Sequence, residues 1–339
     1  MSHYEEFDLL GALPARTTIL EASAGTGKTY TIAALVTRYV VEGIVRLPEL
    51  LVITFGRAAT QELRERVRSQ LREAELALAD PASVGGDHLL QALVAVDESE
   101  LAARRIRVAQ AMADFDAATI ATTHTFCQTV LRSLGVAGDT DRNATLVEDL
   151  DELTQEVIGD LYLAEFASQK EPILSFAHAK TLGRAVIADP QAALVISDDS
   201  DLAQTRKAFA EAVRAEVERR KRHLRILSFD DLLSQLADSL RDGGRGTAER
   251  MRERWKVVLV DEFQDTDPVQ WEVLDLAFRG HATLVLIGDP KQAIYAFRGG
   301  DIFTYLQARN LADSVQTLNT NWRSDAPVVD ALQELLGGA

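Results

Sequence analysis

A short glycine-containing segment combines the residue types that hold the phosphates of a nucleotide. Residues 17–30 read TTILEASAGTGKTY, an apolar run that passes through a turn into a helical pattern. Exposed backbone N–H groups and the helix dipole favour negative charge at such a helix N-terminus. The spacing predicts a P-loop in which Lys28 reaches the β- and γ-phosphates and the Thr29 hydroxyl coordinates Mg²⁺. The backbone amides that we expect to converge on the phosphates belong to Ala24, Gly25, Thr26, Gly27 and Lys28.

The loop is a variant of the general pattern G-x-x-x-x-G-K-[ST], because Ala22 stands where that pattern has its first glycine. Gly25 and Gly27 remain, and they allow the backbone to approach a ligand closely. The alternative is a glycine-rich turn that contains a lysine by chance. The strand pattern before the loop and the helical pattern after it favour the P-loop, and with it an ATPase.

Two adjacent carboxylates follow a buried strand pattern further along the chain. Residues 257–270 read VVLVDEFQDTDPVQ, so Asp261 and Glu262 come where the strand edge of an α/β sheet opens into its ligand crevice. Asp261 can hold Mg²⁺, and Glu262 can orient and deprotonate an attacking water. Gln264 can report the nucleotide state to neighbouring segments. Taken alone, the pair could equally be ordinary surface chemistry at a strand end.

A third strand pattern ends in a polar turn that is followed by aromatic residues. Residues 284–301 read LVLIGDPKQAIYAFRGGD, in which Gln292 can contact the γ-phosphate. Tyr295 and Phe297 are followed by Arg298, and aromatic rings beside a cation suit base stacking on a single strand. The alternative is that both rings belong to the hydrophobic core, where such residues are commonly found.

Composition limits the class of protein. With 339 residues, 47% of them hydrophobic, the chain can bury a sizeable core. We find no apolar run as long as a membrane span and no secretory signal at the N-terminus, so we expect no membrane partner. A single cysteine, Cys127, excludes an intramolecular disulfide and suits a reducing cytoplasm.

The net charge of −16 at first argues against a nucleic-acid partner, but the acidity is regional. Residues 139–218 contain 17 Asp and Glu against 7 Lys and Arg, a net charge of −10, which leaves −6 for the rest of the chain. We interpret the basic runs as solvated helix faces or helix ends. These runs are Arg64, Arg66 and Arg68; Arg104, Arg105 and Arg107; and Arg219, Arg220, Lys221 and Arg222.

Short apolar runs alternate with helical patterns, which predicts an α/β fold with a parallel sheet covered on both faces. The predicted strands are 17–20, 50–54, 119–122, 257–260, 283–287 and 315–318. The predicted helices include 28–41, 57–78, 125–134 and 268–278. Strand signals fade after Gly135, where acidic, alanine-rich helical sequence indicates an inserted subdomain.

Seven segments together carry a resemblance to a known family. They are, in chain order, ASAGTGKT, VITFGRAATQELRERVR, TIATTHTFCQTVLRSLG, LSFDDLL, VDEFQDTDPVQ, GDPKQAIYAFRGGD and LNTNWRS. The chain resembles the N-terminal motor region of superfamily 1A DNA helicases, the UvrD/Rep/PcrA group. Within that group, EASAGTGKT and THTFCQ are most similar to the RecB subunits of exodeoxyribonuclease V.

The resemblance implies a RecA-like motor domain 1A at residues 1–134 and 224–339, with the start of a 2A linker near 325–339. Residues 135–223 would be a helical 1B-like insertion. The family pattern implies that Lys28, Thr29, Asp261, Glu262 and Gln292 serve nucleotide and magnesium. It further implies that Trp322 stacks on adenine, that Arg323 touches the γ-phosphate, and that the single-strand track is lined by Thr54, Phe55, His124, Tyr295, Phe297 and Arg298. Apart from the family pattern, Trp322 would be a packed ring, Thr54 a cap and His124 a buried structural residue.

Three departures from the family pattern affect what we expect. No glutamine precedes Lys28, so the usual adenine-reading residue has no counterpart, and Gly56 stands where a threonine is common. The chain ends soon after Arg323, so we expect a fragment that lacks the second RecA-like domain and its catalytic arginine. Such a fragment would hydrolyse ATP slowly and would not unwind DNA by itself.

The resemblance implies an ATP- and Mg²⁺-dependent 3′→5′ helicase subunit that acts in double-strand-break repair and recombination. Its implied partners are single-stranded or tailed double-stranded DNA and RecC-like and RecD-like subunits. The alternatives are a UvrD- or AddA-type repair helicase, or a module that binds nucleotide or a partner protein without hydrolysis. A P-loop kinase or GTPase is disfavoured, because DEFQDT and LNTNWRS have no place there.

Overall fold

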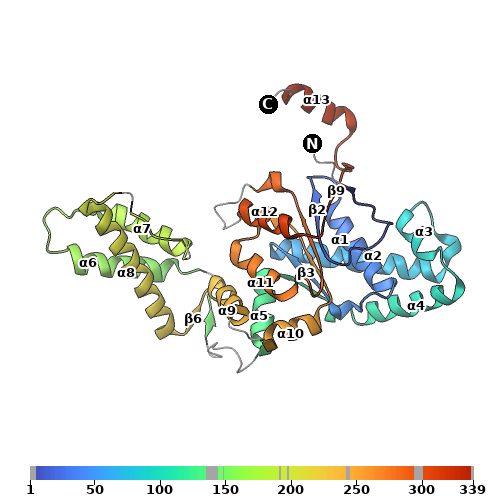
Figure 1. Ribbon diagram of the computed structural model, residues 1–339, viewed down its shortest axis with the longest axis horizontal. Helices are drawn as coiled ribbons and strands as arrows, with labels where there is room; N and C mark the ends of the chain where they lie inside the picture. The colour runs from blue at the N-terminus through green and yellow to red at the C-terminus, as the bar shows by residue number, and fades with distance from the viewer. Residues whose placement is uncertain are drawn as a thin grey trace. The chain divides into compact units, whose positions relative to one another are not determined.

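A seven-stranded parallel sheet forms the centre of the larger part of the molecule (Figure 1). The computed structural model describes residues 5–134, 144–147, 149–190, 192–196, 198–241, 245–293 and 301–336. Every strand pair in the sheet is parallel, and the strand order is β1-β9-β2-β8-β7-β3-β4. The strands are β1 (Glu5–Glu6), β2 (Thr17–Ala22), β3 (Leu50–Thr54), β4 (Thr119–Thr122), β7 (Val257–Val260), β8 (Thr283–Gly288) and β9 (Ser314–Leu318).

The chain folds into two compact units. The first comprises Met1–Gly135 and Leu236–Ala339, and the second comprises Val136–Gln235. The helices of the first unit are α1 (Lys28–Val41), α2 (Arg57–Ala79), α3 (His88–Val94), α4 (Glu98–Ala113), α5 (Thr123–Leu134), α10 (Arg245–Arg254), α11 (Pro268–Phe278), α12 (Ile302–Leu311) and α13 (Ala326–Leu336). Helix α9 (Phe229–Arg241) crosses the boundary between the units.

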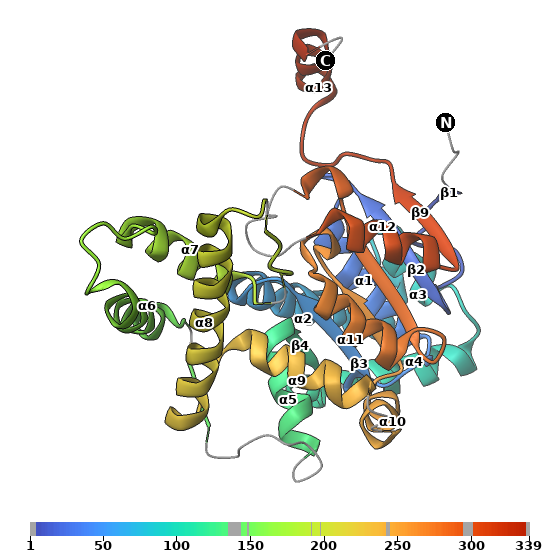
Figure 2. The same cartoon turned by 60° about the vertical axis from the view of Figure 1, so that its left-hand side comes forward.

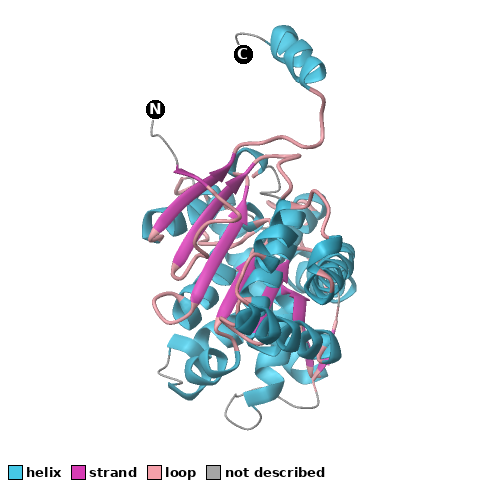
Figure 3. Cartoon of the chain, turned by 90° about the vertical axis from the view of Figure 1, so that its right-hand side faces the viewer, coloured by secondary structure: helices cyan, strands magenta, loops and turns pink. Residues whose placement is uncertain are grey.

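Helices cover both faces of the sheet, as Figures 2 and 3 show. On one face, alternate strand side chains such as Leu20, Val52 and Leu259 pack in one core cluster with residues of α1, α2 and α4. On the other face lies an aromatic cluster in which the Phe126 ring is 5.4 Å from Trp255 and 6.4 Å from Phe278. The predicted α/β fold with a parallel sheet is therefore confirmed.

The predicted element boundaries agree closely with the structure. Strands β3, β4 and β7 and helices α1 and α11 have the predicted bounds, while β2 and β8 are longer by two residues and one residue. Long apolar runs bounded by turn residues explain this agreement. Among the described helices, none is long and apolar enough to cross a bilayer.

The arginines of α4 have a different role from the one expected from sequence. Their guanidinium groups donate to carbonyl oxygens near the C-termini of three neighbouring helices: Arg104 to Leu93 (2.8 Å), Arg105 to Leu78 (2.6 Å) and Arg107 to Val41 (3.0 Å). A helix leaves its last carbonyls without intrahelical partners, and cations are favoured there. The interpretation of this run as a solvated helix face or helix end was wrong, because these arginines lie in the middle of α4 and join it to α1, α2 and α3.

The second unit is a small helical bundle with its own core. Its helices are α6 (Asp151–Phe166), α7 (Phe176–Ala188) and α8 (Asp201–Leu224), and Val157, Phe166 and Phe209 lie in its core. Two short strands, β5 (Thr145–Leu146) and β6 (Ile226–Leu227), pair in parallel.

The basic run at the end of α8 is neutralised by carboxylates of the same unit. The Arg220 guanidinium lies 2.9 Å from Glu156, 2.5 Å from Asp160 and 2.8 Å from Glu216. Lys221 is buried between Glu218 (2.5 Å) and Asp231 (2.6 Å). These ion pairs tie α8 to α6 and α9, so most of this run has a structural role.

We expect Phe126→Ala to lower the free energy of unfolding of the first unit by about 3–5 kcal/mol, because it leaves a cavity in the aromatic cluster. Urea denaturation followed by circular dichroism measures this change. Ile106→Ala is the matched control, because Ile106 is 70% exposed and its loss should change stability by no more than about 0.5 kcal/mol. Equal effects of the two substitutions would contradict the assignment of Phe126 to the core.

Candidate nucleotide-binding site

The P-loop connects β2 to α1 through two glycines in the left-handed region. Gly25 has φ +84° and Gly27 has φ +85°. Gly27 is the N-cap of α1, and its carbonyl accepts the first helical hydrogen bond from the Thr31 N–H at 2.8 Å. A side chain at either position would strain the backbone. The glycines therefore let the strand turn sharply into the helix and leave the helix N-terminus accessible for an anion.

The segment that contains Trp322 lies directly against this loop. The backbone N–H of Trp322 donates to the backbone carbonyl of Gly25 at 2.8 Å. A Cβ atom on Gly25 would lie 2.6 Å from Asn321 Oδ1 and 2.8 Å from Arg323 Cβ, so only glycine fits here. Asn321 Oδ1 also accepts from the Arg323 N–H at 2.9 Å, which holds the turn in shape. The chain thus brings two predicted nucleotide contacts to the P-loop from about 300 residues away.

Trp322 presents a large exposed ring beside the loop. It is 78% exposed, and its Cδ1 lies 3.6 Å from the position of a Cβ on Gly27. The other two tryptophans, Trp255 and Trp271, are 1% and 3% exposed. An exposed indole at this position could stack on a base, and the structure does not support the alternative of a packed ring. The Arg323 side chain is also exposed.

Lys28 forms an ion pair with Glu262. The Lys28 Nζ atom lies 2.7 Å from Glu262 Oε2, and the two side chains are 12% and 33% exposed. Lys28 begins α1, whereas Glu262 follows β7. The pair therefore joins the carboxyl ends of two strands that β8 separates in the sheet. This edge is where ligands bind in open α/β sheets.

Glu262 has an uncommon backbone conformation. Its φ is +50°, in the left-handed region, and its N–H donates to Asp261 Oδ1 at 2.9 Å. A non-glycine residue in this region costs about 1–2 kcal/mol, and such residues cluster at functional sites. The conformation turns the chain sharply after β7 and places two carboxylates side by side.

A chain of hydrogen bonds connects Glu262 to Gln292. Gln264 Nε2 donates to Glu262 Oε2 at 2.8 Å, and Gln264 Oε1 accepts from the Asp289 N–H at 2.9 Å. Asp289 Oδ2 then accepts from Gln292 Nε2 at 2.8 Å. Asp289 lies just after β8, and Gln292 ends the short 3₁₀ helix Pro290–Gln292. The structure therefore brings Lys28, Glu262, Gln264 and Gln292 together in one network.

Burial raises the pKa of Asp261 from 3.8 to about 6. Desolvation is the largest cause and the negative charge of Glu262 the second, while the hydrogen bond from the Glu262 N–H and the charge of Lys28 lower the pKa in part. A carboxylate that is poorly solvated and repelled by its neighbour gains from a nearby divalent cation. Asp261 is therefore well suited to bind a divalent metal ion.

The donor set fits magnesium at a nucleotide site. Thr29 lies in the first turn of α1 and is partly exposed, so its hydroxyl can serve as a second oxygen ligand. Magnesium at such sites uses one or two protein oxygens and completes its coordination with phosphates and water. In the described part of the chain, no group of three or more His, Cys, Asp or Glu side chains could hold a metal.

The predicted DNA contacts are only partly described. Thr54 is 1% exposed, and its hydroxyl lies 2.5 Å from that of Thr60, whereas the Phe55 ring is 38% exposed. His124 lies in the first turn of α5 and is partly exposed. Tyr295, Phe297 and Arg298 lie outside the described residues.

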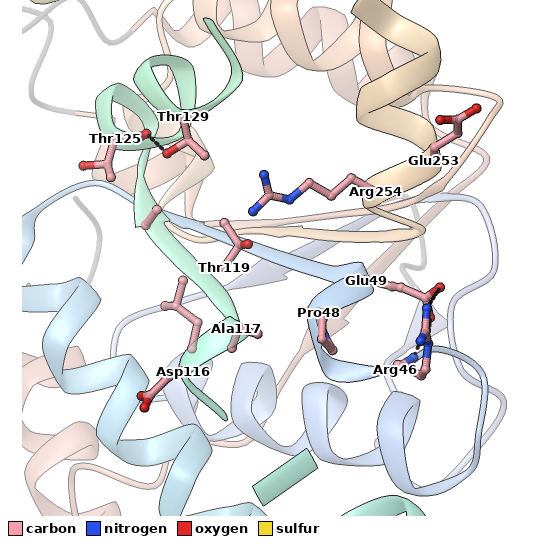
Figure 4. A pocket seen from close by; sticks show the side chains of 13 residues that line it. Arg46, Pro48, Glu49, Asp116, Ala117, Thr119, Thr125, Thr129, Glu253 and Arg254 are labelled. Carbon is pink, nitrogen blue, oxygen red and sulfur yellow. Dashed lines mark hydrogen bonds and ion pairs between the residues drawn. The ribbon is translucent and has the colours of Figure 1, made fainter. Parts of the chain in front are cut away.

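A pocket of about 570 Å³ lies along the edge strand β4 (Figure 4). Its lining includes Arg46 and Glu49 before β3, Thr119 on the edge strand β4, Thr125 on α5 and Arg254 at the end of α10. The parallel strands β3, β4 and β7 begin at this end of the sheet. The P-loop lies at the opposite end, where the strands finish. None of the predicted site residues lines this pocket.

Parallel strands, the glycine loop and the lysine–glutamate pair define an α/β protein of the P-loop class. A family model described as the UvrD/REP helicase N-terminal domain matches residues 9–313. The match covers most of the chain, so the chain belongs to the UvrD/REP helicase family, of which it carries the N-terminal domain. This confirms the resemblance to the UvrD/Rep/PcrA group, and the family implies nucleotide binding.

Curated relatives have the name "RecBCD enzyme subunit RecB". The chain is 58% identical to the protein of Mycolicibacterium smegmatis and 52% identical to that of Mycobacterium tuberculosis. These matches cover 98% and 99% of this chain and 31% of each relative. The Escherichia coli protein is 29% identical over 94% of this chain and 37% of its own length. The chain thus spans about a third of the relatives it matches, and the prediction of a RecB-like region is confirmed.

Sequence reasoning missed two residues that shape the site. Asp289 holds the Gln292 side chain, and Asn321 shapes the turn that carries Trp322 and Arg323. A signal for both exists, since each is a short polar residue that comes just after a strand and favours turns. Their partners could not be inferred, because the contacts depend on how neighbouring strands end.

We expect Asp261→Asn to stabilise the fold at pH 7.5 by about 1–3 kcal/mol in the absence of nucleotide and metal. The folded-state pKa is raised, so the ionised carboxylate costs stability above about pH 6, and that cost disappears as pH falls toward 4. The wild-type stability should therefore decrease between pH 4 and pH 6 more steeply than that of the variant.

Urea titrations at several pH values measure this difference. Asp199→Asn is the control, because Asp199 is exposed. A wild type and an Asp261→Asn variant with parallel pH profiles would refute the desolvation of Asp261.

Proposed function

We propose that this chain is the ATP- and single-stranded-DNA-binding motor region of a 3′→5′ DNA helicase subunit of the RecB type. The observation that carries the proposal is the pairing of Lys28 with Glu262 across the P-loop edge of the sheet. An ammonium and a carboxylate at that position match what phosphoryl transfer to water requires, a phosphate ligand and a group that orients the nucleophile.

The residues have separate roles in the proposed reaction. Lys28 would leave Glu262 for the β- and γ-phosphates, which frees the carboxylate to orient and deprotonate the attacking water. Gln292 and Arg323 would contact the γ-phosphate, and Trp322 would stack on the adenine. The amides of Ala24, Gly25, Thr26, Gly27 and Lys28 would bind phosphate oxygens. Mg²⁺, held by Asp261 and Thr29, would neutralise phosphate charge when it is bound.

The proposed substrates and partners follow from the relatives. Single-stranded or tailed double-stranded DNA would be the track, and RecC-like and RecD-like subunits would assemble with the full-length protein. The role would be double-strand-break repair and recombination in the cytoplasm. Residues 135–223 would form a 1B-like insertion in a RecA-like 1A domain made of residues 1–134 and 224–339. Two alternatives are a UvrD- or AddA-type repair helicase and a binding module without hydrolysis.

The decisive experiment is ATP hydrolysis by the full-length protein with its partner subunits, with and without single-stranded DNA. DNA-stimulated phosphate release together with unwinding of a 3′-tailed duplex supports the helicase. Nucleotide binding without turnover supports the binding module. Unwinding without RecC-like and RecD-like subunits would favour the UvrD-type alternative.

We expect Lys28→Ala to weaken ATP binding at least tenfold, about 1.4 kcal/mol, because it removes a charged donor to the phosphates. Calorimetric titration measures the affinity. Trp322 gives a second signal, since it is the exposed tryptophan of the three and its emission should change when a base stacks on it. Lys207→Ala is the control, because Lys207 is a surface residue of α8. Equal affinities of wild type and Lys28→Ala would refute the P-loop assignment.

We expect stacking to contribute more than bulk charge to DNA binding, because the chain is acidic. Loss of the ring in Phe297→Ala should cost about 1–3 kcal/mol for a single strand. Arg219→Glu should leave binding unchanged, because the Arg219 side chain is paired with Glu216 at 2.7 Å. Fluorescence anisotropy with a labelled oligonucleotide compares the two. The opposite order of effects would show that the basic run binds DNA.

A further inference from the structure

Gln264 occupies a buried position between Glu262, the proposed water-orienting residue, and Gln292, a proposed γ-phosphate contact. It is 3% exposed, and both ends of its side-chain amide are used. The nitrogen donates to Glu262 Oε2 at 2.8 Å, and the oxygen accepts from the Asp289 N–H at 2.9 Å. Neither hydrogen bond could be inferred from composition or from a motif. Both depend on the ends of β7 and β8 lying close together in the folded chain.

The orientation of this amide is determined by its partners. If the amide were flipped, its oxygen would face the Glu262 carboxylate and its nitrogen would face the Asp289 N–H, so both hydrogen bonds would be lost. The end of β8 lies directly against it. A Cβ atom on Gly288 would lie 2.6 Å from Gln264 Oε1 and 3.1 Å from the Gln264 backbone nitrogen. Gly288 is thus required for the close approach of the two segments.

The same amide leads to Gln292 through one further residue. Asp289 uses its N–H for Gln264 and its carboxylate for Gln292 Nε2 (2.8 Å) and the Lys291 N–H (3.1 Å). A shift of Gln264 would therefore displace the Asp289 backbone and with it the turn that carries Gln292. Three hydrogen bonds connect Glu262 to Gln292, and Gln264 makes two of them.

Lys28 and Gln264 donate to the same oxygen of Glu262. In the proposed reaction Lys28 moves to the phosphates, which leaves Gln264 as the side chain that still directs this carboxylate. We propose that Gln264 is a positioning residue that orients Glu262 toward the attacking water and sets Gln292 at the same time through Asp289. The proposal rests on the proposed ATPase function and assigns to Gln264 the joint positioning of Glu262 and Gln292.

Two substitutions perturb this residue from different sides. Gln264→Glu keeps the size of the side chain and an acceptor for the Asp289 N–H, but it replaces the donor to Glu262 with a carboxylate oxygen. Gly288→Ala keeps the glutamine at position 264, but the added methyl group would push against its side-chain amide. Gln110→Glu is the matched control, because Gln110 also donates to a carboxylate, Asp114 Oδ2 at 2.7 Å, on the exposed surface of α4.

The test is steady-state ATP hydrolysis by the full-length protein with its partner subunits at saturating single-stranded DNA. We expect Gln264→Glu and Gly288→Ala each to lower kcat at least tenfold while KM for ATP changes less than threefold. A loss of fold or of nucleotide binding would instead raise KM or lower the thermal midpoint. In a double-mutant cycle, Gln264→Glu and Gln292→Ala together should lose much less than the product of their separate effects.

Three results would decide against the proposal. They are a kcat for Gln264→Glu within twofold of Gln110→Glu, multiplicative effects in the cycle with Gln292→Ala, or losses of kcat that match losses of thermal stability. The variant Lys28→Ala distinguishes failure of the positioning proposal from failure of the proposed ATPase function. If Lys28→Ala is inactive while Gln264→Glu is normal, only the positioning role is refuted. If wild type and Lys28→Ala hydrolyse ATP equally, the ATPase assignment itself fails.

Discussion

The ion pair between Lys28 and Glu262 is the contact on which the geometry of the site depends. It spans the end of β8, where Gly288 leaves room for the Gln264 side chain that donates to the same carboxylate. Desolvation of two charges offsets most of their attraction, so a pair of this kind contributes little net stability. Weak net stabilisation suits the proposed reaction, because a phosphate can replace the carboxylate as the partner of Lys28 at small cost. The pair thus organises the site without blocking it.

Charge elsewhere in the chain is used mainly for internal structure. In the second unit, one arginine of α8 is shared by three carboxylates, and a buried lysine lies between two more. In the first unit, the arginines of α4 bind the ends of three other helices. A count of basic residues is therefore a poor guide to DNA contacts in this protein, because the partners of each cation have to be known first.

Most of the fold could be predicted from sequence because its signals are local. The runs at 50–54, 119–122 and 257–260 are apolar and bounded by turn residues, and each became a strand with those bounds. Individual candidate site residues could be predicted from sequence, but the ion pair and hydrogen bonds that connect them could not. Lys28 and Glu262 are 234 residues apart, and Asn321 meets Gly25 across nearly the whole chain. Such contacts depend on strand order, which the motifs alone do not encode. The role of the α4 arginines was mistaken for the same reason, since their acceptors are backbone carbonyls of other helices.

The turn after β7 contacts two described segments, one that ends at Ala293 and one that begins at Asp301. On one side, Gln264 reaches Asp289 and through it Gln292. On the other, the Asp301 N–H donates to the Thr266 carbonyl at 3.4 Å, and the Tyr305 ring on α12 lies 5.8 Å from Phe263. The turn that begins at Glu262 is therefore held on two sides, by the segment after β8 and by the start of α12. Packed segments shift between discrete arrangements and do not deform continuously. In the proposed reaction, a shift of Glu262 would therefore reach both Gln292 and the start of α12 through the backbone of this one short turn.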